Sequence, residues 1–112
     1  MKEPPVQEKF RRTDPRYDRR LDVELTSNGE TRKGVTRNLS LGGMFIEIAE
    51  PFPVRASVQV KFQVSTQPEP IEVTGEVRWV EAGVAGPLAG MGIRFHGLRA
   101  RDVWALNRYF QS

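Results

Sequence analysis

The sequence predicts an all-β domain with a terminal helix, in which six strands form an antiparallel barrel or sandwich. Three observations predict this class. Apolar and polar residues alternate through six segments, short turns rich in glycine and proline separate them, and the last segment has helical spacing instead. The 112 residues suffice for one hydrophobic core, so we expect a single domain.

The strands are expected where apolar side chains recur at every second position. The first begins at Leu21, and Asn28-Gly29, a strong hairpin signal, joins it to the second, in which Val35 and Leu39 face inward. Gly75 lies within the fifth strand and indicates a bulge or a bend. The expected strands are residues 21–26, 32–41, 44–48, 57–64, 71–81 and 90–97.

The two ends of the chain differ from this pattern. Residues 1–10 are polar with two prolines, and we expect a flexible extension, followed by an arginine-rich arm over residues 11–18. The barrel is expected over residues 19–97. Residues 99–111 contain no helix breaker and carry apolar residues at helical spacing, which predicts an amphipathic helix that covers part of the sheet.

Composition excludes several kinds of function. The chain has no cysteine, which excludes disulfides and thiolate metal sites, and its one histidine, His96, cannot form a metal cluster. No acid–base pair or metal set is visible, so we expect neither an enzyme nor a cofactor. No apolar run is long enough to span a bilayer or to act as a signal peptide, so we expect no membrane insertion and a cytoplasmic location.

The positive charge is concentrated at the N-terminal end. The net charge is +3, and residues 1–20 carry seven Lys or Arg against four acids, whereas the remaining residues carry ten of each sign. Such a segment favours an anionic partner. A nucleic-acid-binding barrel would need exposed aromatic residues on a basic face, but Phe62, Trp79 and Phe95 share the phase of core residues, so we do not expect nucleic acid to be a partner.

The stretch "NLSLGG" suggests a polar site at the end of the second strand. Asn38 and Ser40 are two residues apart, so in an extended chain both side chains point to one face. Gly42 and Gly43 then allow positive φ or the close approach of another group. Taken alone, the stretch fits a structural turn at least as well as a binding site.

The arginine arm favours a ligand-binding site over a structural turn at "NLSLGG". Pro15 keeps the arm from forming a regular helix, and Arg12 and Arg16 present planar guanidinium groups that match phosphate oxygens or the edge of guanine. An arm that folds back over the barrel would meet Asn38 and Ser40. We therefore expect a small, planar, anionic ligand held between the arm and the barrel.

These residues resemble the two-part signature of PilZ domains. Arg-x-x-x-Arg stands at 12–16 and Asn-x-Ser-x-x-Gly at 38–43, and the resemblance extends over nearly the whole chain. It implies a six-stranded antiparallel β-barrel with a C-terminal helix that acts as a receptor for cyclic di-GMP. By this resemblance, Arg12 and Arg16 bind phosphates and guanines, whereas Asn38, Ser40 and Gly43 bind a guanine edge.

Four further residues are candidates for binding the ligand, and some of them fit a purely structural role as well. Arg11 could stack on an outer guanine and so influence whether one or two ligand molecules bind. Trp79 is expected in the core from its phase, although an aromatic residue on a comparable strand stacks on the nucleotide in some PilZ proteins. Gly92 fits either packing or ligand clearance, and Gly42 accompanies Gly43 in the turn.

The sequence is compatible with two functions. The first is a receptor whose arm changes conformation when cyclic di-GMP binds and which signals to a partner protein in bacterial motility, exopolysaccharide or biofilm control. The second is a PilZ-like protein-interaction adaptor that does not bind the nucleotide. In either case we expect a monomer or a weak homodimer.

Overall fold

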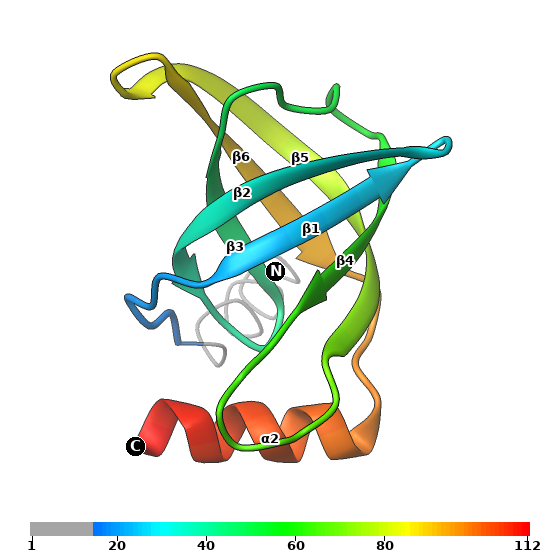
Figure 1. The fold of residues 1–112 in the computed structure, drawn as a ribbon, viewed down its shortest axis with the longest axis vertical. Helices are drawn as coiled ribbons and strands as arrows, with labels where there is room; N and C mark the ends of the chain where they lie inside the picture. Colours follow the sequence, from blue (N-terminus) through cyan, green and yellow to red (C-terminus); the bar gives the residue numbers. More distant parts are fainter. Residues whose placement is uncertain (1–14) are drawn as a thin grey trace, which may run out of the picture.

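In the part of the chain that the structure describes, six antiparallel strands close into a barrel, and one helix lies across one end of it (Figure 1). This computed structural model describes residues 15–112, except for the side chains of residues 84 and 85. The strands follow one another around the barrel in the order β1-β2-β3-β6-β5-β4, so the predicted fold class is confirmed. The elements are β1 (Asp22–Ser27), β2 (Glu30–Leu39), β3 (Gly43–Ile48), β4 (Ser57–Phe62), β5 (Ile71–Ala85), β6 (Leu88–Phe95) and α2 (Ala100–Gln111).

The barrel interior is filled by the alternate side chains of all six strands. Helix α2 closes the lower end in Figure 1 and adds Ala105, Leu106 and Phe110 to the core. Burial of these side chains supplies the main driving force for folding, about 25 cal/mol per Å² of apolar surface. The buried strand residues are Val23, Leu25, Leu39, Met44, Ile46, Ile48, Val58, Val60, Phe62, Ile71, Val73, Val77, Met91, Ile93 and Phe95.

Three register shifts interrupt the strand pairing, one in β2 and two in β5, and the first two along the chain correct expectations. In β2 the register shifts between Thr36 and Asn38, so Thr36 is buried and Val35, which was expected inward, is only half-buried. In β5 the register shifts between Val77 and Trp79. The extra residue turns Trp79 outward, and the interpretation of Trp79 as a core residue is wrong, because a bulge moves later side chains to the opposite face.

The predicted irregularity at Gly75 lies two residues further along the strand. Gly75 itself keeps regular pairing with Val58 and Phe95. A Cβ atom at this position would lie 2.8 Å from the carbonyl oxygen of Arg94 and 2.8 Å from a methyl carbon of Ile93. Glycine is therefore required here for the close approach of β6.

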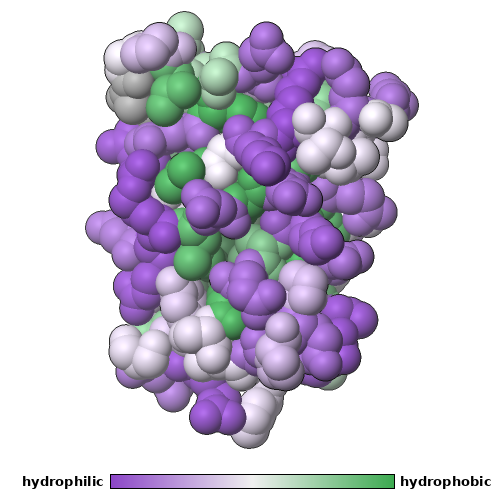
Figure 2. Space-filling view, viewed as in Figure 1, coloured by the Kyte–Doolittle hydropathy of each residue, from purple (hydrophilic) through white to green (hydrophobic). Residues whose placement is uncertain are grey.

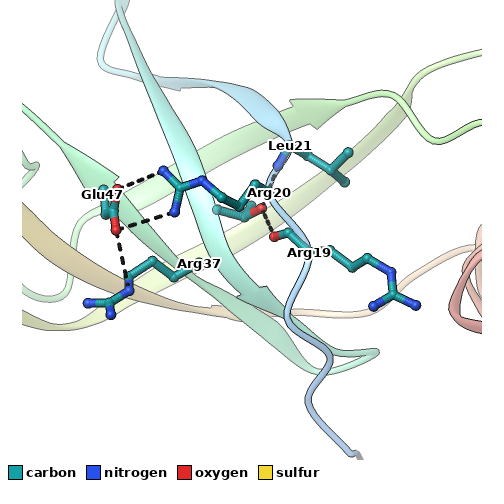
Figure 3. A network of polar contacts seen from close by, with 6 residues as sticks. Arg19, Arg20, Leu21, Arg37 and Glu47 are labelled. Carbon is teal, nitrogen blue, oxygen red and sulfur yellow. Dashed lines mark hydrogen bonds and ion pairs between the residues drawn. The ribbon is translucent and has the colours of Figure 1, made fainter.

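The segment before β1 is fixed to the barrel by backbone pairing. The amide of Tyr17 donates to the carbonyl of Leu39 at 2.9 Å, and the amide of Leu39 donates back to Tyr17 at 3.0 Å. Further along, the hydroxyl of Thr36 accepts a hydrogen bond from the amide of Leu21 and donates to the carbonyl of Arg19 (Figure 3). Residues 17–21 thus follow the edge of β2 before the chain enters β1.

The same segment also contacts the C-terminal half of α2. The ring of Tyr17 stacks on that of Phe110, with centroids 4.0 Å apart and an angle of 10° between the planes. The guanidinium of Arg19 donates to the carbonyl of Phe110 at 3.2 Å and lies 5.5 Å from the ring centroid of Tyr109. Residues 17–21, which include the end of the arginine arm, therefore connect β2 to the helix.

We expect Thr36→Val to destabilise the fold. Valine keeps the shape of threonine but leaves the Leu21 amide and the Arg19 carbonyl without their partner, which costs about 1–3 kcal/mol. Urea denaturation monitored by circular dichroism measures the change. Thr31→Val is the matched control, because its hydroxyl pairs with Thr26 at the exposed surface and its loss should cost less than about 0.5 kcal/mol. Equal effects of the two variants would contradict this role of Thr36.

Candidate functional site

Four residues from four strands form a row across the outer surface of the barrel. In the strand register Asn38 of β2 pairs with Phe45 of β3, Phe45 pairs with Gly92 of β6, and Gly92 pairs with Trp79 of β5. Neighbouring strands in a sheet lie about 4.8 Å apart, so such a row is a continuous surface. Three of the four, Asn38, Trp79 and Gly92, are residues that the sequence singled out. We call this set the outer row.

The apolar half of the outer row is an aromatic shelf made by Phe45 and Trp79. Their ring centroids are 5.8 Å apart and their planes differ by 17°, so the two rings present nearly parallel faces. Trp79 is 41% exposed and Phe45 is partly exposed. An exposed aromatic face such as that of Trp79 can stack against a planar ligand such as a nucleobase.

Gly92 packs directly against the indole ring of Trp79. A Cβ atom at position 92 would lie 2.5 Å from three carbons of the Trp79 indole. Glycine is therefore needed for the indole to lie flat against β6. Between the two alternatives for Gly92, packing and ligand clearance, the structure shows packing against a candidate ligand-binding side chain.

The polar half of the outer row connects to the arginine arm. Nη1 of Arg16 donates to Oδ1 of Asn38 at 2.8 Å, so one residue from each part of the two-part signature is in direct contact. Arg16 is exposed and Asn38 is half-buried, which leaves the remaining guanidinium donors of Arg16 accessible to a ligand. Arg11 and Arg12 lie outside the described residues.

Ser40 and Gly43 shape the turn instead of lying beside Asn38. Strand β2 ends at Leu39, so the expectation that Asn38 and Ser40 share one extended face is wrong. The buried Ser40 hydroxyl accepts hydrogen bonds from the amides of Gly42 and Gly43, at 3.1 and 3.2 Å, and also contacts the Gly43 carbonyl. A Cβ atom at Gly43 would collide with the carbonyl oxygen of Ile93, so this glycine permits the pairing of β3 with β6.

A carboxylate next to the outer row holds two arginines (Figure 3). Oε1 of Glu47 lies 2.9 Å from Nη2 of Arg20, and Oε2 lies 3.3 Å from Nε of Arg37. The hydrogen bond from Arg20 lowers the pKa of Glu47 in spite of its burial, and the same bond raises the pKa of Arg20. Glu47 therefore stays ionised. Its single negative charge is paired with the two positive charges of Arg20 and Arg37, so one positive charge remains in excess beside Asn38.

Sequence reasoning missed several residues around the outer row. Phe45, Glu47 and Arg94 all have the outward phase of their strands, which was the available signal, but phase alone does not say which outward residues are neighbours. Arg94 is exposed on β6, two residues from Gly92 on the same face and opposite Gly43 in the register. It adds a further cation beside the row.

A second concave surface lies between β1, β2 and β4. Figure 2 shows hydrophobic side chains there in a hollow surrounded by hydrophilic ones. Its lining carries two acids, Asp22 and Glu24, and two lysines, Lys33 and Lys61, so its charge is balanced. This surface shares no residue with the outer row, and its balanced charge gives it no preference for an anion.

The described part of the chain contains neither a metal cluster nor a membrane-spanning helix. Within residues 15–112, no group of three or more His, Cys, Asp or Glu side chains could hold a metal ion. In the same range, no helix is both long enough and apolar enough to cross a membrane.

The barrel with its terminal helix, and the contact between the two signature motifs, define a known class of protein. The family model of the PilZ domain matches residues 10–112, and the chain belongs to the PilZ domain family. No curated protein matches the sequence at a significant level.

Solved structures with a similar fold include two bacterial proteins. The inhibitor of motility MotI/DgrA of Bacillus subtilis has a TM-score of 0.72 and 19% identity, over 88% of this chain and 51% of that protein. This chain therefore spans about half the length of the Bacillus protein. The PilZ domain of YcgR from Escherichia coli, solved with c-di-GMP, has a TM-score of 0.68 and 15% identity, over 90% of this chain and 92% of that one.

We expect Gly92→Ala to displace the Trp79 indole while leaving the barrel folded. The clash is with the end of a partly exposed side chain that can move into solvent, so the free energy of unfolding should fall by less than about 1 kcal/mol. Tryptophan fluorescence in a Trp104→Phe background reports Trp79 alone and should shift to longer wavelength. Gly43→Ala is the comparison, because it meets backbone and should cost about 1–3 kcal/mol. An unchanged Trp79 spectrum would contradict the packing described here.

Proposed function

We propose that this chain is a receptor for cyclic di-GMP that passes the signal to a partner protein and is not an enzyme. The contact between Arg16 and Asn38 carries the proposal, because it joins the two motifs on the surface that also bears the aromatic shelf. Membership of the PilZ family and the structure of the YcgR domain with c-di-GMP support the choice of ligand.

The outer row offers groups for each part of such a ligand. A guanine base can stack on Trp79, whose indole already lies flat and exposed. The guanidinium groups of Arg16 and of Arg12 suit the phosphates, since planar forks bind phosphate oxygens with two hydrogen bonds. Arg11 would stack on an outer guanine. Asn38 would bind a guanine edge after Arg16 turns towards the phosphate.

Ser40, Gly42 and Gly43 have an indirect role in this proposal. Their hydrogen bonds close the turn after β2 and fix the position of Asn38 relative to β3. The Ser40 hydroxyl already has partners within the turn, so its contribution is to hold the turn in shape. We therefore expect Ser40→Ala to reduce affinity less than replacement of an arginine.

A route for the signal runs from the arm to helix α2. Arg16 is followed directly by Tyr17, which pairs with Leu39 and stacks on Phe110. A ligand that draws the arm over the outer row would act on the helix through this stack. Control of bacterial motility, exopolysaccharide or biofilm formation is the proposed output, and the name of the Bacillus neighbour supports motility among them.

Cyclic di-GMP should bind the purified chain, and Arg12→Ala or Arg16→Ala should each weaken binding about ten- to a hundredfold. This is the effect of losing a charged hydrogen bond worth about 1.5–3 kcal/mol. Binding should also weaken as salt is raised, because exposed charges are screened. Isothermal titration calorimetry measures both effects. Arg55→Ala, an exposed arginine in the loop before β4, is the matched control. No binding to the unaltered chain would favour the adaptor that lacks a nucleotide.

Cyclic di-GMP should slow hydrogen exchange in residues 9–14 and leave β4 unchanged. The reason is that the ligand gives the arginines an anion against which the arm can order, whereas β4 lies on another side of the barrel. The amide of Tyr17 is already bonded to Leu39, so the ligand-dependent change should end near this residue. Mass spectrometry of exchanged peptides measures it. Equal protection of the arm with and without ligand would mean that the site is preformed.

A further inference from the structure

Helix α2 presents two faces of different chemistry. The inner face contains Asp102, Ala105, Leu106 and Phe110, which are buried against the barrel. The outer face contains four exposed residues at the spacing of one stripe along a helix. They are Arg101, Trp104, Arg108 and Gln111. We call this set the outer stripe.

Trp104 is the prominent residue of the outer stripe. Its side chain is 66% exposed, compared with 41% for Trp79, and it contributes nothing to the core. The guanidinium of Arg108 lies 5.2 Å from its ring centroid, a cation–π contact that favours this orientation of the indole by about 0.5–1 kcal/mol. A large indole exposed in this way is available for contact with another molecule, and the contact with Arg108 reduces the conformational freedom that it would lose on binding.

The charge on this face has one sign. Arg101 and Arg108 flank Trp104, and Arg99 lies at the start of the helix. The one acid of α2, Asp102, is buried on the inner face, where it accepts hydrogen bonds from Gln67 at 3.1 Å and from Arg99 at 3.0 Å and forms an ion pair with Arg101 at 3.9 Å. The three arginines, Arg99, Arg101 and Arg108, carry three positive charges against this one carboxylate, which leaves two positive charges in excess. The outer stripe therefore attracts a partner with negative charge.

We propose that the outer stripe is a docking surface for a protein partner whose carboxylates flank an apolar socket for Trp104. Tryptophan and arginine are the residues that most often dominate the binding energy of protein interfaces. A second copy of this face is a poor occupant, because it would bring arginine against arginine. A membrane surface is also a poor occupant, because the apolar face of α2 is already buried against the barrel.

This proposal goes beyond the binding of cyclic di-GMP and does not depend on it. The outer stripe shares no residue with the outer row. Arg16→Ala should weaken nucleotide binding and leave partner binding unchanged, whereas Trp104→Ala should weaken partner binding and leave nucleotide binding unchanged. The two proposals can therefore fail separately.

The partner can be found by placing a photo-crosslinking residue beside Trp104. Asn107 is exposed and lies one turn from Trp104, so Asn107→p-benzoylphenylalanine reports contacts of the outer stripe. The same residue at exposed Gln59 of β4 is the control position. Crosslinking is done in the cells from which the gene comes, and a protein captured at position 107 and not at 59 is identified and purified.

Titration of that purified protein then tests the chemistry. Trp104→Ala and the double variant Arg101→Glu/Arg108→Glu should each weaken its binding at least tenfold, whereas Arg55→Glu should not. Exchange of a partner carboxylate near the crosslink for lysine should restore binding to Arg108→Glu. Circular dichroism confirms that each variant is folded.

Four outcomes overturn the proposal. These are no protein specific to position 107, binding that is unaffected by the Trp104 and arginine variants, a crosslink to a second copy of the chain, or binding of phosphatidylglycerol vesicles that depends on Trp104. The last two would assign the outer stripe to self-association or to a membrane surface instead.

Discussion

The pairing of β3 with β6 is the contact on which the remaining structure depends. These strands are separated in the sequence by β4 and β5, and their hydrogen bonds join the two halves of the sheet into a closed barrel. The approach requires glycine at position 43, where a side chain would meet the backbone of Ile93. The register that results places Phe45 opposite Gly92 and so builds the shelf for Trp79. A slip of one residue would turn every one of these side chains to the other face.

The segment from Pro15 to Leu21 links several elements of the fold to one another. Backbone bonds attach it to β2, the ring of Tyr17 attaches it to α2, and Arg20 attaches it to Glu47 on β3. One short stretch of chain thus contacts two strands and the helix. These contacts are the route by which the proposed receptor would alter its surface when a ligand moves the arm.

Much of the fold could be predicted from the sequence, and so could the contact between the two motifs. Alternation located all six strands because one face of each is buried, and the two-part motif located Arg16 and Asn38. The position of Trp79 could not be predicted, because a bulge is decided by pairing with a distant strand. For the same reason Phe45 and Glu47 were missed as neighbours of Asn38. Their outward phase was visible, but the register between β3 and β6 was not.

Closure of the barrel has a consequence for how such a protein can change over time. Every strand has two hydrogen-bonded neighbours, so the barrel has no edge strand whose whole length could pair with another chain and start aggregation. The backbone ladder is satisfied whatever side chains point outward. Outer positions can therefore be exchanged freely, and the same barrel persists in proteins that share only 15–19% of their residues with this chain. Selection can rewrite the surface for a new partner without having to rebuild the scaffold beneath it.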